Sequence, residues 1–461
     1  MTAATSTNFA TDTNGRRIRE NITVFKARRE KVLAALNGTP LLVASHPEFL
    51  RNDDVEHSYR PDSNLYYLTG FEEPESILLL LPGRTPQTVL FVRKKNVERE
   101  TWDGFRFGID AAKAEFGVDA VFPIDDFHLH SVTLLKDFED IYFRMFKNEW
   151  ADQIFKKLLK DLKKVYGRAG YGLLTVKDAD TFLGEFRLRK DSYDLQNLRK
   201  ACEISARGHV LAMKLTQPGI NEKHLEGLII SEFYKHGAMR EGYGAIVASG
   251  SSATTLHYRF NDQVCKDGDL LLIDAGAEYN FYTGDITRTF PVNGRFTTPQ
   301  KSVYDLVLKI QKQVIEAIKP GVLFKDLQEM GVNLITDALF ELGLLTGRKE
   351  DVIKSLEYKK YYPHGIGHWL GMDVHDTGLY MIKGKPQPLE AGMCFTVEPG
   401  IYIPAADKTA PAELRGIGVR IEDNVMITEK GCEVLTSLVP KEVEEIELLM
   451  TRSALATTIT L

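Results

Sequence analysis

The C-terminal half of the chain contains an internal repeat, and this repeat limits how that half can fold. The segments QPGINEKHLEGLI (217–229) and KPGVLFKDLQEMG (319–331) both read Pro-Gly-aliphatic, then four residues, then leucine. In each copy an apolar helical run precedes the Pro-Gly, and another follows the leucine. An extended segment carrying two acidic residues comes after each copy. The matching order of these features indicates that one unit was duplicated.

The first copy leads into a strand that ends in an aspartate. The run LLLIDAG (270–276) has the length and apolar character of a strand covered on both faces, and Asp274 ends it. A turn then leads back into DITRTFPV (285–292), so a hairpin would bring Asp274 and Asp285 face to face. Two facing buried aspartates need a proton or a cation between them. The alternative is that each pairs with a nearby arginine, such as Arg288, or caps a turn.

The second copy adds two more carboxylates in apolar surroundings. AGMCFTVEPGIYI (391–403) places Glu398 at the end of an apolar strand, and RGIGVRIEDNVMIT (415–428) places Glu422 inside a glycine-rich strand. Four carboxylates that converge on one place require counter-charge. Arg288 and Arg420 supply at most two positive charges, whereas two divalent cations would supply four. The sequence therefore favours a site with two metal ions.

A histidine cluster completes this donor set. The segment PHGIGHWLGMDVHDTG (363–378) holds three of the chain's 11 histidines, His364, His368 and His375, among closely spaced glycines. Such glycines are expected where backbone approaches a site closely. Four carboxylates with one imidazole and no thiolate suit Mn²⁺, Fe²⁺ or Co²⁺ better than structural zinc. Shared carboxylates would hold two such ions about 3.5–4 Å apart, as in hydrolytic two-metal enzymes.

Composition excludes several other classes of protein. The 461 residues predict two or three domains at about 150 residues each. A net charge of −6 gives no phosphate-seeking surface, so we expect no nucleic-acid partner. The four cysteines are scattered without a CxxC pair, so the sequence indicates neither a disulfide framework nor a thiolate zinc site. With no apolar run of about 18 residues and no signal-peptide pattern, we expect a cytoplasmic protein with no membrane partner.

The N-terminal part reads as a separate α/β unit. Residues 1–15 are polar and aperiodic, and we expect them to be disordered. Residues 16–36 predict a helix. Short apolar runs bounded by turn residues predict strands at 40–45, 76–83 and 88–94. A charged stretch at 186–215 predicts a linker that enters a long helix. We place one domain at 16–180 and a second at 190–461.

Five motifs, in order, carry a resemblance to a known family. They are LHYRFND (256–262), IDAGAEYNFYTGDITRTFP (273–291), PHGIGHWLGMDVHD (363–376), GMCFTVEPGIYI (392–403) and RGIGVRIEDNV (415–425). Together they resemble the aminopeptidase P branch of the creatinase/prolidase family of pita-bread metallopeptidases. RPDSNLYYLTGFEEPES (60–76) and residues 99–125 resemble the N-terminal domain of that branch. The resemblance implies an α/β (α+β) chain: an N-terminal creatinase-like domain, then a C-terminal pita-bread catalytic domain with two pseudo-symmetric halves.

The resemblance also implies a role for each site residue. It places two divalent metal ions, with Mn²⁺ favoured and Co²⁺, Fe²⁺ or Zn²⁺ as alternatives, on Asp274, Asp285, His368, Glu398 and Glu422. Asp285 and Glu422 would bridge the two ions. The histidines that match those lining the family's substrate site are His257, His364 and His375. Arg420 matches an arginine beside the hydrogen-bond network behind the ligands, and we assign it to the substrate site.

The implied activity is that of an aminopeptidase that hydrolyses an N-terminal Xaa-Pro bond through a metal-bridging hydroxide. Glu398 would take a proton from the hydroxide's parent water and pass it to the leaving proline nitrogen. His375 would stabilise the oxyanion, while His257 and His364 hold the substrate. Tyr258 and Trp369 are predicted to line the pocket for the proline ring. For Trp369, a place in the core is the alternative.

Other readings remain open on the sequence. A prolidase would take Xaa-Pro dipeptides, whose free carboxylate it must hold near the ring. A non-catalytic binding module of the same fold, or a creatinase that works without metal, would be expected to lack ligands that this chain retains. The resemblance further implies a homo-oligomer, either a dimer or a tetramer. One departure from the family pattern concerns the pocket rim: Arg259 and Phe260 stand where relatives usually carry small or acidic residues.

Overall fold

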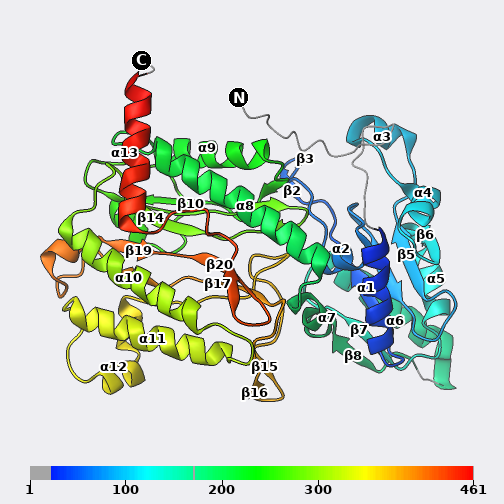
Figure 1. Cartoon of the computed structure of the whole chain (residues 1–461). Coiled ribbons are helices and arrows are strands. Elements are labelled where there is room, and N and C mark those ends of the chain that lie inside the picture. Colours follow the sequence, from blue (N-terminus) through cyan, green and yellow to red (C-terminus); the bar gives the residue numbers. More distant parts are fainter. Residues whose placement is uncertain (1–21, 170–171, 460–461) are drawn as a thin grey trace. The chain divides into compact units, whose positions relative to one another are not determined.

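The computed structural model describes residues 22–169 and 172–459, and the chain divides into two compact units, Met1–Phe186 and Arg187–Leu461. Figure 1 shows both units as ribbons coloured along the sequence. The predicted disordered segment, residues 1–15, lies outside the described residues. Among those residues, no helix has the length and hydropathy needed to span a bilayer.

The first unit is built on a mixed sheet with strand order β6-β5-β4-β1-β7-β8. The predicted strands at 40–45, 76–83 and 88–94 are confirmed as β1, β4 and β5. Every residue of β4 and β5 is buried, which explains why these runs are continuously apolar. The sheet strands are β1 (Leu41–Ala44), β4 (Ile77–Leu80), β5 (Thr88–Val92), β6 (Ala120–Pro123), β7 (Asp140–Phe143) and β8 (Thr175–Asp178).

Helices and one small hairpin complete this unit. The hairpin joins β2 (Leu50–Asn52) to β3 (Val55–Glu56). Side chains of α5 and α6 form a core with β1, β4, β5 and β7. The predicted helix at 16–36 is α1 where it is described. The helices are α1 (Ile22–Ala35), α2 (Ser63–Thr69), α3 (Val97–Asp103), α4 (Gly108–Glu115), α5 (Phe127–Leu134), α6 (Glu149–Tyr166) and α7 (Ala179–Leu188).

The second unit begins with the first copy of the repeat. Two helices, α8 (Ser192–Leu215) and α9 (Glu222–Lys235), flank the first Pro-Gly. An antiparallel sheet follows, in the order β10 (Ile246–Ser249), β11 (Leu270–Asp274) and β14 (Thr287–Pro291). The predicted return from the first aspartate strand is confirmed, since Asp274 pairs with Thr287 across β11 and β14. A small sheet of β9 (Arg240–Glu241), β12 (Ala277–Tyr279) and β13 (Tyr282–Thr283) lies within the connections.

The second copy repeats this order. Helices α10 (Thr298–Ala317) and α11 (Phe324–Glu341) flank the second Pro-Gly, and α12 (Lys349–Ser355) follows. The strands are β15 (Met381–Ile382), β16 (Lys385–Pro386), β17 (Cys394–Val397), β18 (Gly400–Tyr402), β19 (Gly418–Arg420), β20 (Asp423–Ile427) and β21 (Cys432–Val434), before α13 (Val443–Ile459). Three of them, β17, β20 and β21, form an antiparallel sheet.

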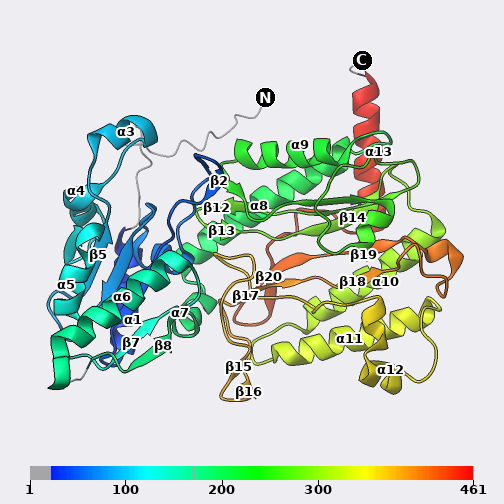
Figure 2. The ribbon, with the colours of Figure 1, turned by 180° about the vertical axis from the view of Figure 1, so that it is seen from behind.

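The two Pro-Gly turns have the same backbone form. Gly219 and Gly321 have φ angles of +91° and +88°, a conformation that residues with a Cβ rarely adopt. Gly219 therefore allows the chain to turn between α8 and α9, and Gly321 allows the same turn between α10 and α11. Figures 1 and 2 show β14, β19 and β20 between the α8–α9 pair and the α10–α11 pair. One continuous apolar core spans both copies, with Phe290 and Ile335 among its members.

A buried ion pair also joins the two copies. Arg288 of β14 donates from Nη2 to Oδ1 of Asp423 in β20 at 2.7 Å, and both side chains are 0% exposed. Lys441 contacts the other carboxylate oxygen of Asp423 at 2.6 Å. These cations hold the pKa of Asp423 below its ordinary value, although burial alone would raise it. Arg288 is thus already committed and is not the counter-charge for the candidate metal site.

We expect Asp423→Ala to lower the free energy of unfolding of the second unit by about 3–5 kcal/mol, because it leaves a buried arginine unpaired. Urea denaturation followed by circular dichroism measures this loss. The control is Lys325→Ala, which removes an exposed pair with Glu329 on α11 and should cost less than about 1 kcal/mol. Equal losses in the two variants would contradict the role given to the buried pair.

Candidate metal and substrate site

A cavity of about 820 Å³ opens in the second unit. This volume lies in the range of pockets that hold small organic ligands. Its walls come from both copies of the repeat. Of the residues predicted for the site, those that line it are Asp274, Asp285, His368, Glu398, Glu422, His257, His364, His375 and Arg420. The structure therefore gathers the five predicted metal ligands and the outer histidines around one space.

The ends of strands place the four carboxylates. Asp274 is the last residue of β11, and Asp285 lies two residues before β14. Glu398 directly follows β17. The sequence predicted Glu422 inside a strand. In the structure it lies between β19 and β20 and forms an isolated bridge with Thr287. That bridge ties the two copies together at the cavity.

Close backbone packing positions the histidine segment. The chain around His368 runs beside β17, with Thr396 N–H donating to His368 O at 2.9 Å and Leu370 N–H donating to Cys394 O at 3.0 Å. A Cβ on Gly367 would lie 1.8 Å from the carbonyl oxygen of Thr396, so only glycine fits there. The glycines that marked this segment in the sequence thus reflect its close approach to a strand.

A backbone contact fixes the orientation of His368. Its Nδ1–H donates to the carbonyl of Trp369 at 3.0 Å. Nε2 therefore faces the carboxylates, 3.4 Å from Asp285 and 3.5 Å from Glu398. An imidazole whose far nitrogen donates to a carbonyl is the usual arrangement of a metal-binding histidine.

The pKa values show carboxylates crowded without enough positive charge. Burial raises the pKa of Glu398 to about 7. Burial, with the charge of Asp285, raises the pKa of Glu422 well above its ordinary value, and burial also raises that of Asp285. Although burial alone would lower the pKa of His368, its contacts with Asp285 and the charge of Glu398 raise it to about 9. In the protein alone, Arg420 offsets part of this repulsion, and bound protons must relieve the rest.

The donor set fits divalent cations. One ligand atom each from Asp285, His368 and Glu422 lie within 4.8 Å of one another. The cavity lining supplies carboxylate oxygens and imidazole nitrogens and includes no cysteine among the described residues. Oxygen-rich sites with imidazole suit first-row divalent ions. Such ions would also neutralise the charge that raises these pKa values.

Further contacts hold the carboxylates from behind. Arg420 donates from Nη2 to Asp274 at 2.6 Å, and Thr287 donates to Glu422 at 2.7 Å. The hydroxyl of Tyr243 lies 2.5 Å from Oδ1 of both Asp274 and Asp285. The sequence reasoning missed Tyr243. The one available signal was its place between Gly242 and Gly244, which resembles the glycine spacing around the histidines.

The three histidines predicted to line the substrate site, His257, His364 and His375, differ in their contacts and burial. His364 donates from Nδ1 to Gly365 O at 2.8 Å, and its Nε2 accepts from Tyr402 at 2.8 Å. Burial lowers the pKa of His364 to about 4, so this ring is neutral. The ring of His375 meets that of His368 edge-on, with centroids 4.3 Å apart, and burial lowers its pKa. His257 is exposed on the cavity wall.

Neither of the two side chains predicted to line the pocket for the proline ring, Tyr258 and Trp369, lines the cavity. Tyr258 is 8% exposed and its hydroxyl donates to Glu222 at 3.1 Å. Trp369 is 2% exposed and stacks on Tyr380, so the core alternative holds for it. The apolar part of the cavity wall instead includes Ile246, Leu256 and Val374.

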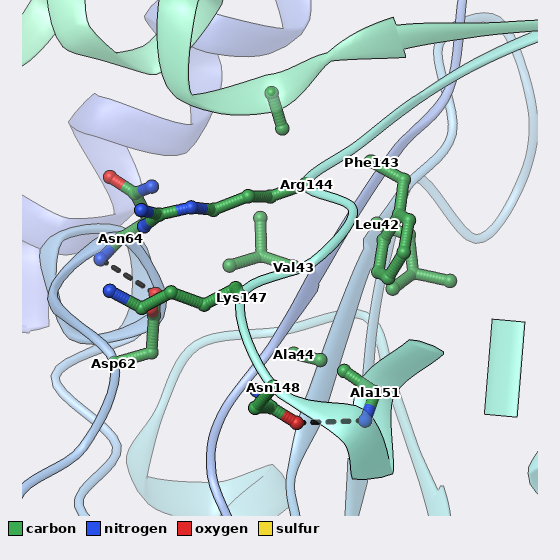
Figure 3. Close-up of a pocket in the computed structure, with 11 residues that line it drawn as sticks. Leu42, Val43, Ala44, Asp62, Asn64, Phe143, Arg144, Lys147, Asn148 and Ala151 are labelled. Atoms are coloured by element: carbon green, nitrogen blue, oxygen red, sulfur yellow. Dashed lines mark hydrogen bonds between the residues drawn. The ribbon is translucent and has the colours of Figure 1, made fainter. Parts of the chain in front are cut away.

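A second cavity, in the first unit, is too small for a substrate. It lies where β1 and β7 end and α6 begins, with Asp62, Arg144 and Lys147 around it (Figure 3). Its volume is about 20 Å³, which is room for about one water molecule. The cavity of about 820 Å³ in the second unit is the candidate active site because it gathers the four carboxylates and the histidines.

Two models of known protein families match the chain, one in each unit. A family model described as metallopeptidase family M24 matches residues 196–429. Another, described as aminopeptidase P, N-terminal domain, matches residues 25–142. The first range contains every carboxylate and histidine of the cavity, and the second contains most of the mixed sheet of the first unit.

Relatives match over nearly the whole chain. An Xaa-Pro aminopeptidase of Haemophilus influenzae is 40% identical over 92% of this chain and 96% of its own length. One of Escherichia coli is also 40% identical, over 92% and 97%. The aminopeptidase PepP of Pseudomonas aeruginosa superposes with a TM-score of 0.90 at 43% identity, covering 95% of this chain and 99% of that one. Zn-substituted aminopeptidase P of E. coli, in complex with product, superposes with a TM-score of 0.89 at 39% identity, covering 95% of this chain and 99% of that one. These structures confirm the predicted fold class.

Proposed function

The chain belongs to metallopeptidase family M24, and from this premise we propose that it removes the N-terminal residue of peptides whose second residue is proline. It is a metallo-exopeptidase, as its relatives show. The observation that carries the proposal is the convergence of four carboxylates and His368 on one cavity. The Xaa-Pro aminopeptidases to which it is similar over most of its length give the substrate class.

The residues that would hold two divalent cations are Asp274, Asp285, His368, Glu398 and Glu422. Bound there, the cations would supply positive charge that lowers the pKa of water and makes hydroxide available as nucleophile near neutral pH. The mixture of carboxylates and one imidazole favours Mn²⁺, with Co²⁺, Fe²⁺ and Zn²⁺ as alternatives. A cytoplasmic location and a homo-oligomeric state stay predictions.

In this proposal Glu398 moves the proton. Its carboxylate lies on the cavity wall between Thr396, which donates to Oε1 at 3.2 Å, and His364, whose Nδ1 is 3.8 Å away. When the C–N bond breaks, the proline nitrogen must gain a proton to leave as an amine, as any peptide nitrogen must. Glu398 would accept a proton from water and return it to that nitrogen.

The histidines would bind and polarise the substrate. His375 stands beside His368 on the cavity wall and would donate to the oxyanion of the tetrahedral intermediate. His364 is held by Tyr402 and Gly365, so its ring forms a fixed wall next to Glu398. His257 faces the same space from the first copy of the repeat. Arg420 is committed to Asp274 and Tyr402, which favours a positioning role behind the ligands over direct substrate contact.

The substrate test compares three peptides on Mn²⁺-loaded protein. We expect hydrolysis of Ala-Pro-Ala at the Ala-Pro bond, at least about 10-fold weaker kcat/KM for the dipeptide Ala-Pro, and no hydrolysis of Ala-Ala-Ala. Mass spectrometry of the products gives the bond cleaved. Preference for the dipeptide would assign a prolidase instead. Protein that binds metal but cleaves none of the three would be the non-catalytic module.

A further inference from the structure

An arginine on the cavity wall is not used by the proposed chemistry. Arg259 follows His257 and Tyr258 in the loop after β10, and it lines the same cavity as the carboxylates. The geometry points to a specificity-determining role: Arg259 binds the C-terminal carboxylate of short peptide substrates and gives this chain a preference for peptides with a free C-terminus. This inference rests on the proposed aminopeptidase function.

The loop that carries Arg259 is anchored on both sides. Before it, Tyr258 is buried and its hydroxyl donates to Glu222. After it, Asn261 is 1% exposed and accepts from Val247 N–H at 3.0 Å while donating to Ala245 O at 2.8 Å. The exposed pair Arg259 and Phe260 therefore stands between two fixed points. A side chain presented from a fixed backbone loses less entropy when it binds a ligand.

The charges around the cavity leave Arg259 available. The other arginine of the lining, Arg420, is buried and donates to Asp274 and Tyr402. The acidic residue on the wall outside the metal cluster, Glu226, forms an ion pair with Lys223. Within the described part of the chain, no side chain forms a hydrogen bond or ion pair with the guanidinium of Arg259, which is exposed.

The chemistry of this arrangement selects an anionic group of the substrate, because Arg259 lines the cavity and is not one of the predicted metal ligands. A guanidinium matches a carboxylate with two parallel hydrogen bonds, which an amide or a passing peptide bond cannot reproduce. The cavity, at about 820 Å³, holds only a few residues, so only a short peptide ends inside it. A longer peptide would carry its carboxylate beyond the reach of Arg259. Free-acid tripeptides are accordingly the class that this residue favours.

The test compares Ala-Pro-Ala with its C-terminal amide. We expect wild-type protein to have about 10-fold higher kcat/KM for the acid, through KM, as one charge-assisted contact implies. In Arg259→Ala this ratio should fall to about one, with the amide unaffected, and Arg259→Lys should restore part of it. Calorimetry with the products Pro-Ala and Pro-Ala amide gives a readout independent of turnover, with the same loss of discrimination expected.

Phe260→Ala is the matched control, because Phe260 is next in the loop, is 71% exposed and does not line the cavity. It should keep the wild-type ratio. An unchanged acid-to-amide ratio in Arg259→Ala, or equal binding of the two products by the wild type, overturns the inference while the proposed function stands. Wild-type protein that hydrolyses neither peptide overturns the proposed function, and this inference with it.

Discussion

Replacing Glu398 with alanine is expected to lower kcat for Xaa-Pro peptides by about 10³-fold or more. The reason is that one carboxylate has two duties in the proposed site, as a ligand and as the group that moves the proton. Loss of a positioned acid–base group alone typically costs 10²- to 10⁴-fold in rate. Steady-state kinetics with Ala-Pro-Ala measures the effect.

Two further variants separate the two duties of Glu398. Glu398→Gln keeps an oxygen that can contact a metal ion but cannot accept a proton, so it should lose turnover while retaining part of the metal content. The control is Glu390→Ala, which removes a carboxylate shortly before β17 that pairs with Arg189 and does not line the cavity. It should leave kcat within about 2-fold of wild type, as expected for a surface change. Near-normal kcat in Glu398→Ala would refute the assignment.

The gathering of the carboxylates could be predicted because their sequence setting is energetically unusual. Asp274 is the last residue of a strand that is buried throughout, and Glu398 directly follows another, where an unpaired charge is costly. Such a carboxylate needs a positive counter-charge, and four carboxylates in related positions can share the same one. The position of Glu422 outside a strand could not be predicted, because its bridge to Thr287 joins two segments distant in sequence and leaves no local sequence pattern.

The substrate pocket could not be predicted in the same way. Large aromatic residues fill cores as readily as they line pockets, so the identities of Tyr258 and Trp369 did not decide between the two. What decides is packing against residues distant in sequence, such as Glu222 for Tyr258 and Phe395 for Trp369. Tyr243 was missed for the related reason that its two aspartate contacts exist only after the strands are placed.

Removing divalent metal is expected to abolish hydrolysis and to destabilise the second unit more at pH 8 than at pH 5.5. Without metal, Asp285, Glu398 and Glu422 have pKa values raised above their ordinary ones, so the folded protein holds protons that the unfolded chain releases. This stabilisation is complete below about pH 4.5 and is lost as pH rises through the folded pKa, about 7 for Glu398. The raised pKa of His368 acts in the same direction up to about pH 9.

The shift of Glu398 alone corresponds to a stability change on the order of 3 kcal/mol across this window. Bound cations remove the dependence, because they replace protons as the counter-charge. Thermal unfolding of chelated and Mn²⁺-reloaded protein should therefore give midpoints that differ by roughly 5–10 °C more at pH 8 than at pH 5.5. Chelated Glu398→Gln should show a weaker pH dependence, since this residue no longer titrates. Equal midpoints at every pH, or hydrolysis that survives chelation, would mean that these carboxylates are not neutralised by metal.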